Sequence, residues 1–328
     1  MKNIIQKIKE SQLLGRSGSS YPVFMKWEAV KSADTDEKYV VCNGGEGEME
    51  TFKDYFLFKN YPDIILDGIK IAMRELEAKK AFIYLKKSYF DEFYSDLQGL
   101  INDDIKIFEK KGGYVGGEET AVIEAIEGNR PEPRIKPPFP TESGLWGKPT
   151  LVNNTETFYF ISKINSDDYH NTRFFSIAGD TLNKGVFEFD ENITIKELLE
   201  KTNNIPSFDY FLQVGGGSSG QIILPEEIDN KINCLGSIII YNRETTDLFL
   251  LMGKWVDFFL EGNCDKCTPC REGLFRIKEM IEKKDFSAID DLFFVMEKTS
   301  LCPLGKAATF PFSTLLEKII LKKNESNN

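Results

Sequence analysis

The sequence predicts an α/β domain over residues 1–165, a small mixed unit over 172–235 and a helical bundle over 245–322. In the first part, short apolar runs alternate with stretches of helical periodicity, which is typical of a parallel sheet built from βαβ units. In the last part, apolar residues recur at helical spacing alone. The 328 residues, of which 41% are apolar, are enough for a large core divided among several domains.

The first domain begins its sheet with residues 38–42, an apolar run that reads as a buried strand. Two more strands are expected at 81–85 and 105–108, with helices between them. The first strand runs directly into the glycine-rich, acidic segment Asn43–Glu48. An open α/β sheet binds its ligands where parallel strands end, so a Rossmann-like domain with a site at this loop is predicted.

Three other segments of this domain carry residues suited to a nucleotide. The small-residue loop at 15–22 allows backbone N–H groups to converge on a phosphate, although any Gly/Ser-rich turn would look the same. The glycines at 112–117 precede a helix that Gly128 ends, and a helix N-terminus attracts anions. Asn153 and Asn154 carry amides able to bind the edge of a heterocycle.

The second unit combines a predicted hairpin, at 174–179 and 185–189, with a helix that Thr194 and Glu197 cap. This pattern suits a β-grasp, ubiquitin-like domain. The glycine-rich run at 215–220 is interpreted as a structural turn, since no helical pattern follows it. From Thr245 onward, four apolar helical faces predict a four-helix bundle.

Four cysteines mark the predicted metal site of this bundle. Three of them are spaced two residues apart and the fourth follows in another loop, before a proline: Cys264, Cys267, Cys270 and Cys302. This pattern favours a [4Fe–4S] cluster, which needs four thiolates at tetrahedral corners. Zinc is the alternative, although its Cys₄ sites usually use two Cys-x-x-Cys pairs; four unliganded thiols are the second alternative. Cys42 and Cys234 are interpreted as buried structural thiols.

Composition excludes several classes of protein. A net charge of −11 with mixed signs argues against nucleic acid as a partner. The sequence contains no apolar run long enough to span a membrane, which argues against direct membrane insertion. The N-terminal residues lack the apolar core of a signal peptide and the cysteines fit a reducing compartment, so a cytoplasmic location is expected.

Five segments occur together and in order: the loop at 15–22, Tyr-Val-Gly-Gly-Glu-Glu-Thr-Ala (114–121), Arg-Ile-Lys-Pro-Pro-Phe-Pro (134–140), Gly-Lys-Pro-Thr-Leu-Val-Asn-Asn (147–154) and Cys-x-x-Cys-Thr-Pro-Cys-Arg-Glu-Gly (264–273). Together they resemble the NADH-binding flavoprotein subunit of respiratory complex I and the related diaphorase subunits of NAD-linked hydrogenases and formate dehydrogenases. The resemblance covers about residues 12–320.

The resemblance implies FMN in the α/β domain, with NADH stacked on it and a [4Fe–4S] cluster nearby. The implied FMN-binding residues are Gly15, Arg16, Gly18, Lys26, Asn43, Glu46, Tyr114, Gly117, Glu118, Glu119, Val152, Asn153, Asn154 and Thr157. The implied NADH-binding residues are Tyr21, Glu48, Lys136 and Phe139. No catalytic general base is required, because the flavin carries the hydride chemistry.

This sequence departs from the usual pattern of the family at several positions. Ser17, Ser20 and Phe24 stand in a loop that is usually glycine-rich, and a positive φ at any of them would strain the backbone. Phe24 is also expected to add a ring near the nucleotide. Gly45 replaces an acid that usually helps to bind the sugar chain of the flavin.

The expected function is oxidation of NADH to NAD through FMN, with single electrons passed to the [4Fe–4S] cluster and on to partner subunits. The resemblance implies a [2Fe–2S] thioredoxin-like subunit and a larger iron–sulfur subunit as partners, in a complex at the inner face of the cell membrane. Two alternatives stay open: the same cofactors used with another donor or acceptor, such as NADPH or ferredoxin, and a degenerate, non-catalytic assembly subunit.

Overall fold

The computed structural model describes residues 3–18, 20–232 and 236–321, and these form two compact units. The first unit comprises Met1–Gly47, Phe52–Gly112 and Gly116–Phe174. The second comprises Glu48–Thr51, Gly113–Val115 and Phe175–Asn328. Two short segments, 48–51 and 113–115, therefore belong to the second unit, although the residues before and after each of them belong to the first.

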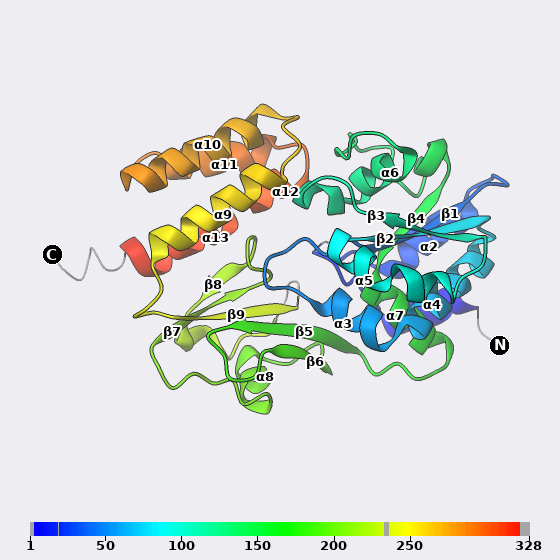
Figure 1. Cartoon of the computed structure of the whole chain (residues 1–328), viewed down its shortest axis with the longest axis horizontal. Coiled ribbons are helices and arrows are strands. Elements are labelled where there is room, and N and C mark those ends of the chain that lie inside the picture. Colours follow the sequence, from blue (N-terminus) through cyan, green and yellow to red (C-terminus); the bar gives the residue numbers. More distant parts are fainter. Residues whose placement is uncertain (1–2, 19, 233–235, 322–328) are drawn as a thin grey trace. The chain divides into compact units, whose positions relative to one another are not determined.

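The first unit is built on a parallel four-stranded sheet of order β3-β2-β1-β4 (Figure 1). Its strands are β1 (Tyr39–Gly44), β2 (Lys80–Leu85), β3 (Ile105–Glu109) and β4 (Thr150–Asn154). The first three confirm the predicted strands. The fourth was not predicted as a strand, because its short apolar part, Leu151 and Val152, precedes two asparagines.

Seven α-helices accompany this sheet in the described part of the first unit. They are α1 (Ile4–Ser11), α2 (Val23–Ser32), α3 (Lys53–Asn60), α4 (Pro62–Leu76), α5 (Lys87–Gln98), α6 (Glu119–Glu127) and α7 (Thr155–Asn165), with the short 3₁₀ turn η2 (Leu145–Gly147). A second 3₁₀ turn, η1 (Tyr114–Gly117), begins in the second unit and ends in the first. Gly68 permits α4 to pack closely on α7, since a Cβ there would lie 2.0 Å from the Phe158 carbonyl oxygen. Gly128 ends α6 at φ 88°, as predicted.

The sheet of the second unit has five strands in the order β6-β5-β9-β7-β8. They are β5 (Thr172–Gly179), β6 (Gly185–Asp190), β7 (Tyr210–Val214), β8 (Gln221–Ile223) and β9 (Ser237–Asn242), accompanied by α8 (Ile195–Lys201) and the 3₁₀ turn η3 (Pro225–Glu227). Strand β9 is parallel to β5 and antiparallel to β7, which is antiparallel to β8. The capping box of Thr194 and Glu197 at the start of α8 is confirmed.

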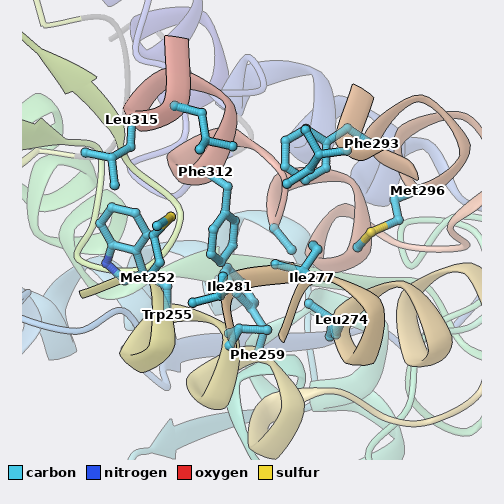
Figure 2. Close-up of a cluster of buried hydrophobic side chains, with 14 of the residues drawn as sticks. Met252, Trp255, Phe259, Leu274, Ile277, Ile281, Phe293, Met296, Phe312 and Leu315 are labelled. Carbon is cyan, nitrogen blue, oxygen red and sulfur yellow. The ribbon is translucent and has the colours of Figure 1, made fainter. Parts of the chain in front are cut away.

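The C-terminal part of this unit is helical: α9 (Leu248–Gly262), α10 (Thr268–Lys283), α11 (Ile289–Thr299), α12 (Pro303–Ala307) and α13 (Phe310–Leu315), which continues as the π-helical segment η4 (Leu316–Leu321). The short α12 was not predicted. Trp255, Phe259, Leu274, Ile277 and Phe312 are fully buried in the core between these helices (Figure 2). Burial of one such side chain stabilises the fold by about 1.5–3 kcal/mol. Among the described residues, no helix is both long and apolar enough to cross a membrane.

Candidate functional site

The first unit has a reversal of strand order at the ends of β1 and β4. Strand β1 lies between β2 and β4, so the chain leaves β1 toward one side of the sheet and returns from β3 to the other. Ligands of open α/β sheets bind at such topological switch points, beyond the carboxyl ends of the strands. Asn43 and Asn154, which are paired in register, mark this position on the two strands.

Four charged residues form one ion-pair network in this unit. The Lys26 ammonium lies 2.7 Å from Oε2 of Glu119 and 3.4 Å from the Val152 carbonyl oxygen. Lys136 lies 2.8 Å from Oε1 of Glu118 and 2.7 Å from Oε1 of Glu119. The residues selected from the sequence are therefore brought together by the fold from separate segments.

The electrostatics of this network favour its charged forms. Burial tends to raise the pKa of Glu119, but Lys26 and Lys136 outweigh burial and hold that pKa below 4.5. Burial tends to lower the pKa of Lys136, and the two glutamates raise it above 10.5. Glu118 also caps α6, because its Oε2 accepts hydrogen bonds from the backbone N–H groups of Thr120 (2.8 Å) and Ala121 (3.0 Å).

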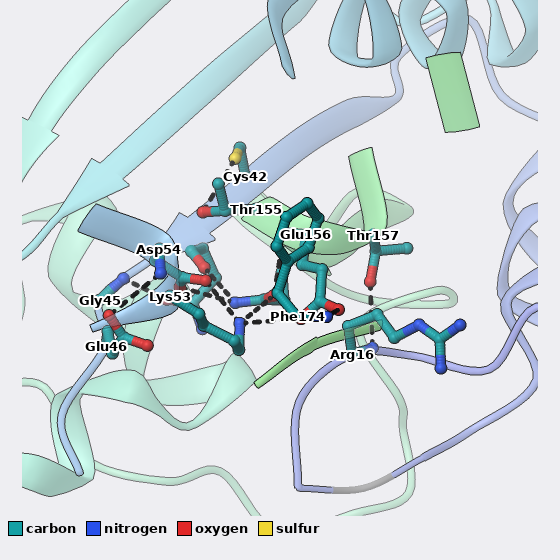
Figure 3. Close-up of polar contacts among 12 residues, drawn as sticks. Arg16, Cys42, Gly45, Glu46, Lys53, Asp54, Thr155, Glu156, Thr157 and Phe174 are labelled. Carbon is teal, nitrogen blue, oxygen red and sulfur yellow. Dashed lines mark hydrogen bonds and ion pairs between the residues drawn. The ribbon is translucent and has the colours of Figure 1, made fainter. Parts of the chain in front are cut away.

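The charged residues of a second network, Lys53, Asp54 and Glu156, are buried near the end of β4 (Figure 3). The Lys53 ammonium lies 2.5 Å from Asp54, 3.0 Å from Oδ1 of Asn154 and 3.3 Å from Glu156. Asn154 accepts a second bond from the Glu156 N–H (3.0 Å) and donates to the Asn43 carbonyl (3.2 Å) and to Asp54 (2.9 Å). Two bonds accepted and two donated use the whole capacity of its amide. Asn154 therefore has no bonding capacity left for a ligand.

Glu46 borders this network and has bonding capacity left. Its Oε2 accepts from the Asp54 N–H (3.1 Å) and the Tyr89 hydroxyl (2.8 Å), while its buried Oε1 has no hydrogen-bond partner among the described residues. Burial, followed by the charge of Asp54, raises the pKa of Glu46 to about 7. A buried acceptor without a partner is costly, and a ligand hydroxyl would satisfy it.

Other predicted flavin residues are partly used inside the protein. In the orientation that satisfies both its amide atoms, Asn153 donates to the Val152 carbonyl (3.1 Å) and accepts from Trp27 Nε1 (3.2 Å). The Arg16 guanidinium is buried, 5.2 Å from the Phe160 ring, and its Nη2 donates to the Thr172 carbonyl (3.0 Å). The backbone N–H of Arg16 donates to Oγ1 of Thr157 (3.2 Å). The side chain of Arg16 therefore has a structural role.

The small-residue loop closes on itself through a 2.9 Å bond from the Gly15 N–H to the Tyr21 carbonyl. Ser20 has φ 45°, so it adopts the strained conformation anticipated for the serines of this loop, whereas Ser17 has no positive φ. Phe24 lies in α2 with its ring 5.1 Å from the Lys9 ammonium. Tyr21 and Phe139 are 44% and 50% exposed, so both rings are available for stacking on a base.

Two predicted site residues, Glu48 and Tyr114, belong to the second unit. Glu48 is buried, and its Oε2 accepts from the backbone N–H groups of Ser218 (3.1 Å) and Ser219 (3.3 Å). The hydroxyls of Tyr114 and Ser219 both donate to its Oε1. Gly216, at φ 121°, leaves room for this carboxylate, because a Cβ there would lie 2.6 Å from Oε2. The glycine-rich run is thus a structural turn, as predicted, and it binds a carboxylate of the protein itself.

The four cysteines of the predicted cluster site gather at one place in the helical part of the same unit. Cys264 and Cys267 precede α10, Cys270 lies in its first turn, and Cys302 directly precedes α12. Burial, and then the charges of Cys267, Cys302 and Cys264, raise the pKa of Cys270 to about 12. The thiols are therefore close enough to repel one another as anions, a condition that a bound cation would relieve.

Comparison with known proteins finds matches for two separate segments of the chain. Residues 8–163 match the family model of the Nuo51 FMN-binding domain, and residues 251–319 match that of the NADH-ubiquinone oxidoreductase-F iron–sulfur binding region. The F subunit of the NADH-quinone oxidoreductase of Aquifex aeolicus is 30% identical over 96% of this chain and 84% of its own length. This chain belongs to the family of NADH-quinone oxidoreductase F subunits.

Two relatives of this chain come from hydrogenases. The alpha subunit of the NAD-reducing hydrogenase HoxS of Cupriavidus necator is 32% identical over 96% of this chain and 59% of its own length. A solved NAD⁺-reducing [NiFe]-hydrogenase in the H₂-reduced state superimposes with a TM-score of 0.88 at 27% identity, over 96% of this chain and 61% of that chain. This chain thus spans about three fifths of each of these hydrogenase chains.

The residues present fit both cofactors of this family, FMN and an iron–sulfur cluster. In the FMN-binding region, Glu46 offers an unused buried acceptor, and Lys26 has two partners for its three N–H donors within the described part of the chain. In the iron–sulfur region, the thiols of Cys264, Cys267 and Cys302 all lie near that of Cys270, although among the described residues no three of them stand in metal-binding geometry. Cys42 is not one of them: it is buried, its Sγ lies 3.8 Å from the Thr155 hydroxyl, and burial raises its pKa. Cys234 lies outside the described residues.

Sequence reasoning missed the buried charges Lys53, Asp54 and Glu156. Charged residues are seldom buried unless they are paired, so a sequence alone favours reading them as exposed. The available signal was the position of Lys53 and Asp54 shortly after the acidic loop, and of Glu156 shortly after Asn154. Each therefore lies near a segment already predicted to bind the flavin.

Proposed function

We propose that this chain oxidises NADH through bound FMN and passes single electrons to a [4Fe–4S] cluster and on to a partner subunit. The observation that carries the proposal is the presence, in one chain, of a nucleotide-type switch point and four gathered thiols, each within its own family region. Flavin supplies the conversion between two-electron and one-electron chemistry when it is bound. The residues of this chain bind and orient the cofactors.

The flavin would be held mainly by the groups with bonding capacity left. Lys26 has a spare donor, Glu46 a spare buried acceptor, and the Asn43 amide donates only to the Gly117 carbonyl (2.9 Å) among the described residues. Gly15, Gly18 and Gly117 would let the backbone approach the ligand. Four other predicted residues would not contact the flavin directly but would hold in place the segments that carry these groups: Arg16, Glu118, Asn154 and Thr157.

NADH would stack against exposed rings and meet carboxylates. Tyr21 and Phe139 supply the rings. Glu119, held ionised by Lys26 and Lys136, would repel the 2′-phosphate of NADPH if it faces that ribose. Like charges a few ångströms apart cost on the order of 1–4 kcal/mol at partly exposed sites, which is enough for a tenfold preference for NADH. Glu48 would take part only after leaving the turn that now binds it.

The cluster would bind Cys264, Cys267, Cys270 and Cys302. Within the described residues, no three or more His, Cys, Asp or Glu side chains already stand in metal-binding geometry. The thiols would therefore turn toward one another as the cluster is inserted, with loss of their protons.

The finer architecture belongs to the same proposal. We divide the chain into an α/β domain (1–165), a β-grasp domain (172–235) and a helical bundle (245–322). The strand order β6-β5-β9-β7-β8, with parallel β5 and β9 next to each other and α8 after the first two strands, supports the β-grasp assignment. The helices α9, α10, α11 and α13 would form the four-helix bundle, with α12 carrying Cys302 into it.

The acceptor would be another iron–sulfur subunit. The relatives are subunits of NADH-quinone oxidoreductase and of NAD-reducing hydrogenase by name. A [2Fe–2S] thioredoxin-like subunit and a larger iron–sulfur subunit are the proposed partners, in an assembly in the cytoplasm at the inner face of the membrane.

Anaerobic spectroscopy of the purified full-length chain tests the proposal. We expect bound FMN, about four irons per chain as a [4Fe–4S] cluster requires, and bleaching of the flavin by NADH that is faster than by NADPH. Zinc in place of iron would exclude the cluster. Folded protein that takes up no FMN would favour the assembly-subunit alternative, and a loaded protein that neither nucleotide bleaches would require a different donor.

A further inference from the structure

Lys110 is a cation that the resemblance does not include in the flavin site. It follows β3, and its long side chain reaches toward the ends of the neighbouring strands: its Nζ donates to the Gly45 carbonyl at 3.0 Å. A Cβ on Gly116 would lie 3.3 Å from its Cε, and a Cβ on Gly117 would lie 3.8 Å from its Nζ. The ammonium thus lies among glycines of two predicted flavin-binding segments.

Lys110 differs from the other lysines near this site. Lys26, Lys53 and Lys136 each contact at least one carboxylate. Among the described residues, Lys110 makes no ion pair, and Gly45 is the one hydrogen-bond partner of its ammonium. Two of the three N–H donors of the Lys110 ammonium therefore have no hydrogen-bond partner among the described residues.

The surroundings of Lys110 disfavour its charge. Burial, and to a smaller extent the charge of Lys86, lower its pKa to about 8. A mostly buried cation without an anion is costly, and an anion that binds beside it would remove that cost. The Lys110 side chain also lies beside Gly45, where a Cβ would be 3.3 Å from Lys110 Cδ. The glycine therefore leaves room for a lysine next to a position at which the resemblance expects an acid.

We propose that Lys110 is an anion-binding residue of the flavin site, whose ammonium pairs with a negatively charged oxygen of bound FMN. This inference rests on the proposed function. Two parts of the flavin supply such an oxygen: the phosphate, and the N1–C2=O edge of the ring, which becomes negative on reduction. The shared chemistry is an anionic oxygen beside Gly45 and Gly117, and the two sources make different predictions.

The test compares three forms of the full-length chain: wild type, Lys110→Met and Lys111→Met. Lys111 is the matched control, because its side chain is 64% exposed and its ammonium lies 4.0 Å from the Glu109 carboxylate. After removal of the flavin, each protein is titrated with FMN and with riboflavin, which lacks the phosphate. The midpoint potential of the bound flavin is measured by anaerobic reduction against a reference dye.

If the phosphate is the partner, Lys110→Met weakens FMN binding at least tenfold and leaves riboflavin binding unchanged. If the reduced ring is the partner, binding of oxidised FMN is unchanged, but that of reduced FMN weakens at least tenfold, which lowers the two-electron potential by about 30 mV. In either case, Lys111→Met behaves as wild type and Lys110→Arg restores the lost property.

Folding is checked by thermal unfolding of the flavin-free proteins, in which Lys110→Met is expected to be at least as stable as wild type because a buried charge is removed. The inference is overturned if Lys110→Met matches wild type in both affinities and in potential, or if Lys111→Met shows the same changes. Wild type that binds no FMN would overturn the proposed function as well, so the two failures are distinguishable.

Discussion

The flavin region and the cysteine region use their motif residues differently. In residues 8–163, many motif side chains bond to the protein itself: Asn154 uses all four of its hydrogen bonds, and Arg16 is buried against Phe160. In residues 251–319, the four thiols lie near one another. Burial and the charges of the neighbouring thiols raise the pKa of Cys270. A motif residue can therefore stabilise the fold rather than bind a ligand. Only its contacts in the structure show which of the two roles it has.

Cys302→Ala has the largest expected effect, since it would remove one of the four proposed ligands and the link that the cluster would make between the loops before α10 and α12. We expect iron to fall from about four per chain to nearly none, with loss of thermal stability, because metal binding and folding are coupled at such sites. Iron analysis and thermal unfolding of anaerobic protein measure both effects. Cys42→Ala is the control, since that thiol lies beside Thr155 in the first unit, and it should keep its iron. Full iron in Cys302→Ala would place the cluster on other ligands.

Asn154→Ala tests the structural side of the comparison. It removes a hydrogen-bond partner from each of the buried Lys53 and Asp54 and deletes the N-cap of α7. Unmet buried groups cost roughly 1–3 kcal/mol each and a cap about 1 kcal/mol. Because Lys53 and Asp54 still contact each other, the low end of each range applies, and a loss of about 3 kcal/mol is expected in urea unfolding of flavin-free protein.

Lys26→Ala is the matched variant for that measurement. Its ion pair with Glu119 is partly exposed, and Lys136 still neutralises Glu119, so stability should fall by less than about 1 kcal/mol. FMN affinity should nevertheless fall more in Lys26→Ala than in Asn154→Ala, when both variants are measured under conditions in which they are folded. The reverse order of affinities would break the comparison and make Asn154 a direct flavin ligand.

Glu46→Gln sharpens the comparison through pH. The folded-state pKa of Glu46 is raised to about 7 from 4.5, so between these values the folded chain holds a proton that the unfolded chain has lost. Its contribution to stability is therefore complete below about pH 4.5 and is lost as the pH rises to 7. At pH 8 the Gln variant should be more stable than wild type by roughly 1–3 kcal/mol, with the difference vanishing near pH 4. An equal difference at both pH values would show that Glu46 titrates normally.

Local patterns predicted much of the fold. Apolar runs located β1, β2 and β3, the capping box located α8, and Gly128 marked the end of α6. The spacing of the cysteines also predicted that they lie near one another. Cys264, Cys267 and Cys270 fall within one short segment at the start of α10.

Contacts between residues far apart in the sequence could not be predicted from such local patterns. The bonds from Ser218 and Ser219 to Glu48 join residues about 170 positions apart, and nothing local to Glu48 predicts that its carboxylate is already bound. The buried charges of Lys53 and Glu156 are stable only because the fold brings them together. Such residues look exposed in a sequence, since their burial depends on partners that only the tertiary structure supplies.

Ser20→Gly has the smallest expected effect and concerns the loop in which the sequence departs from glycine. Ser20 holds φ 45°, a conformation that costs a residue with a Cβ roughly 1 kcal/mol and costs glycine little. Glycine also gains freedom in the unfolded chain, which offsets part of the benefit. A net stabilisation of about 0–1 kcal/mol is therefore expected in urea unfolding. Ser17→Gly, at a position without positive φ, should instead destabilise slightly through unfolded-state entropy alone. If both variants lose stability equally, the loop does not store strain at Ser20, and the serines there are tolerated for another reason.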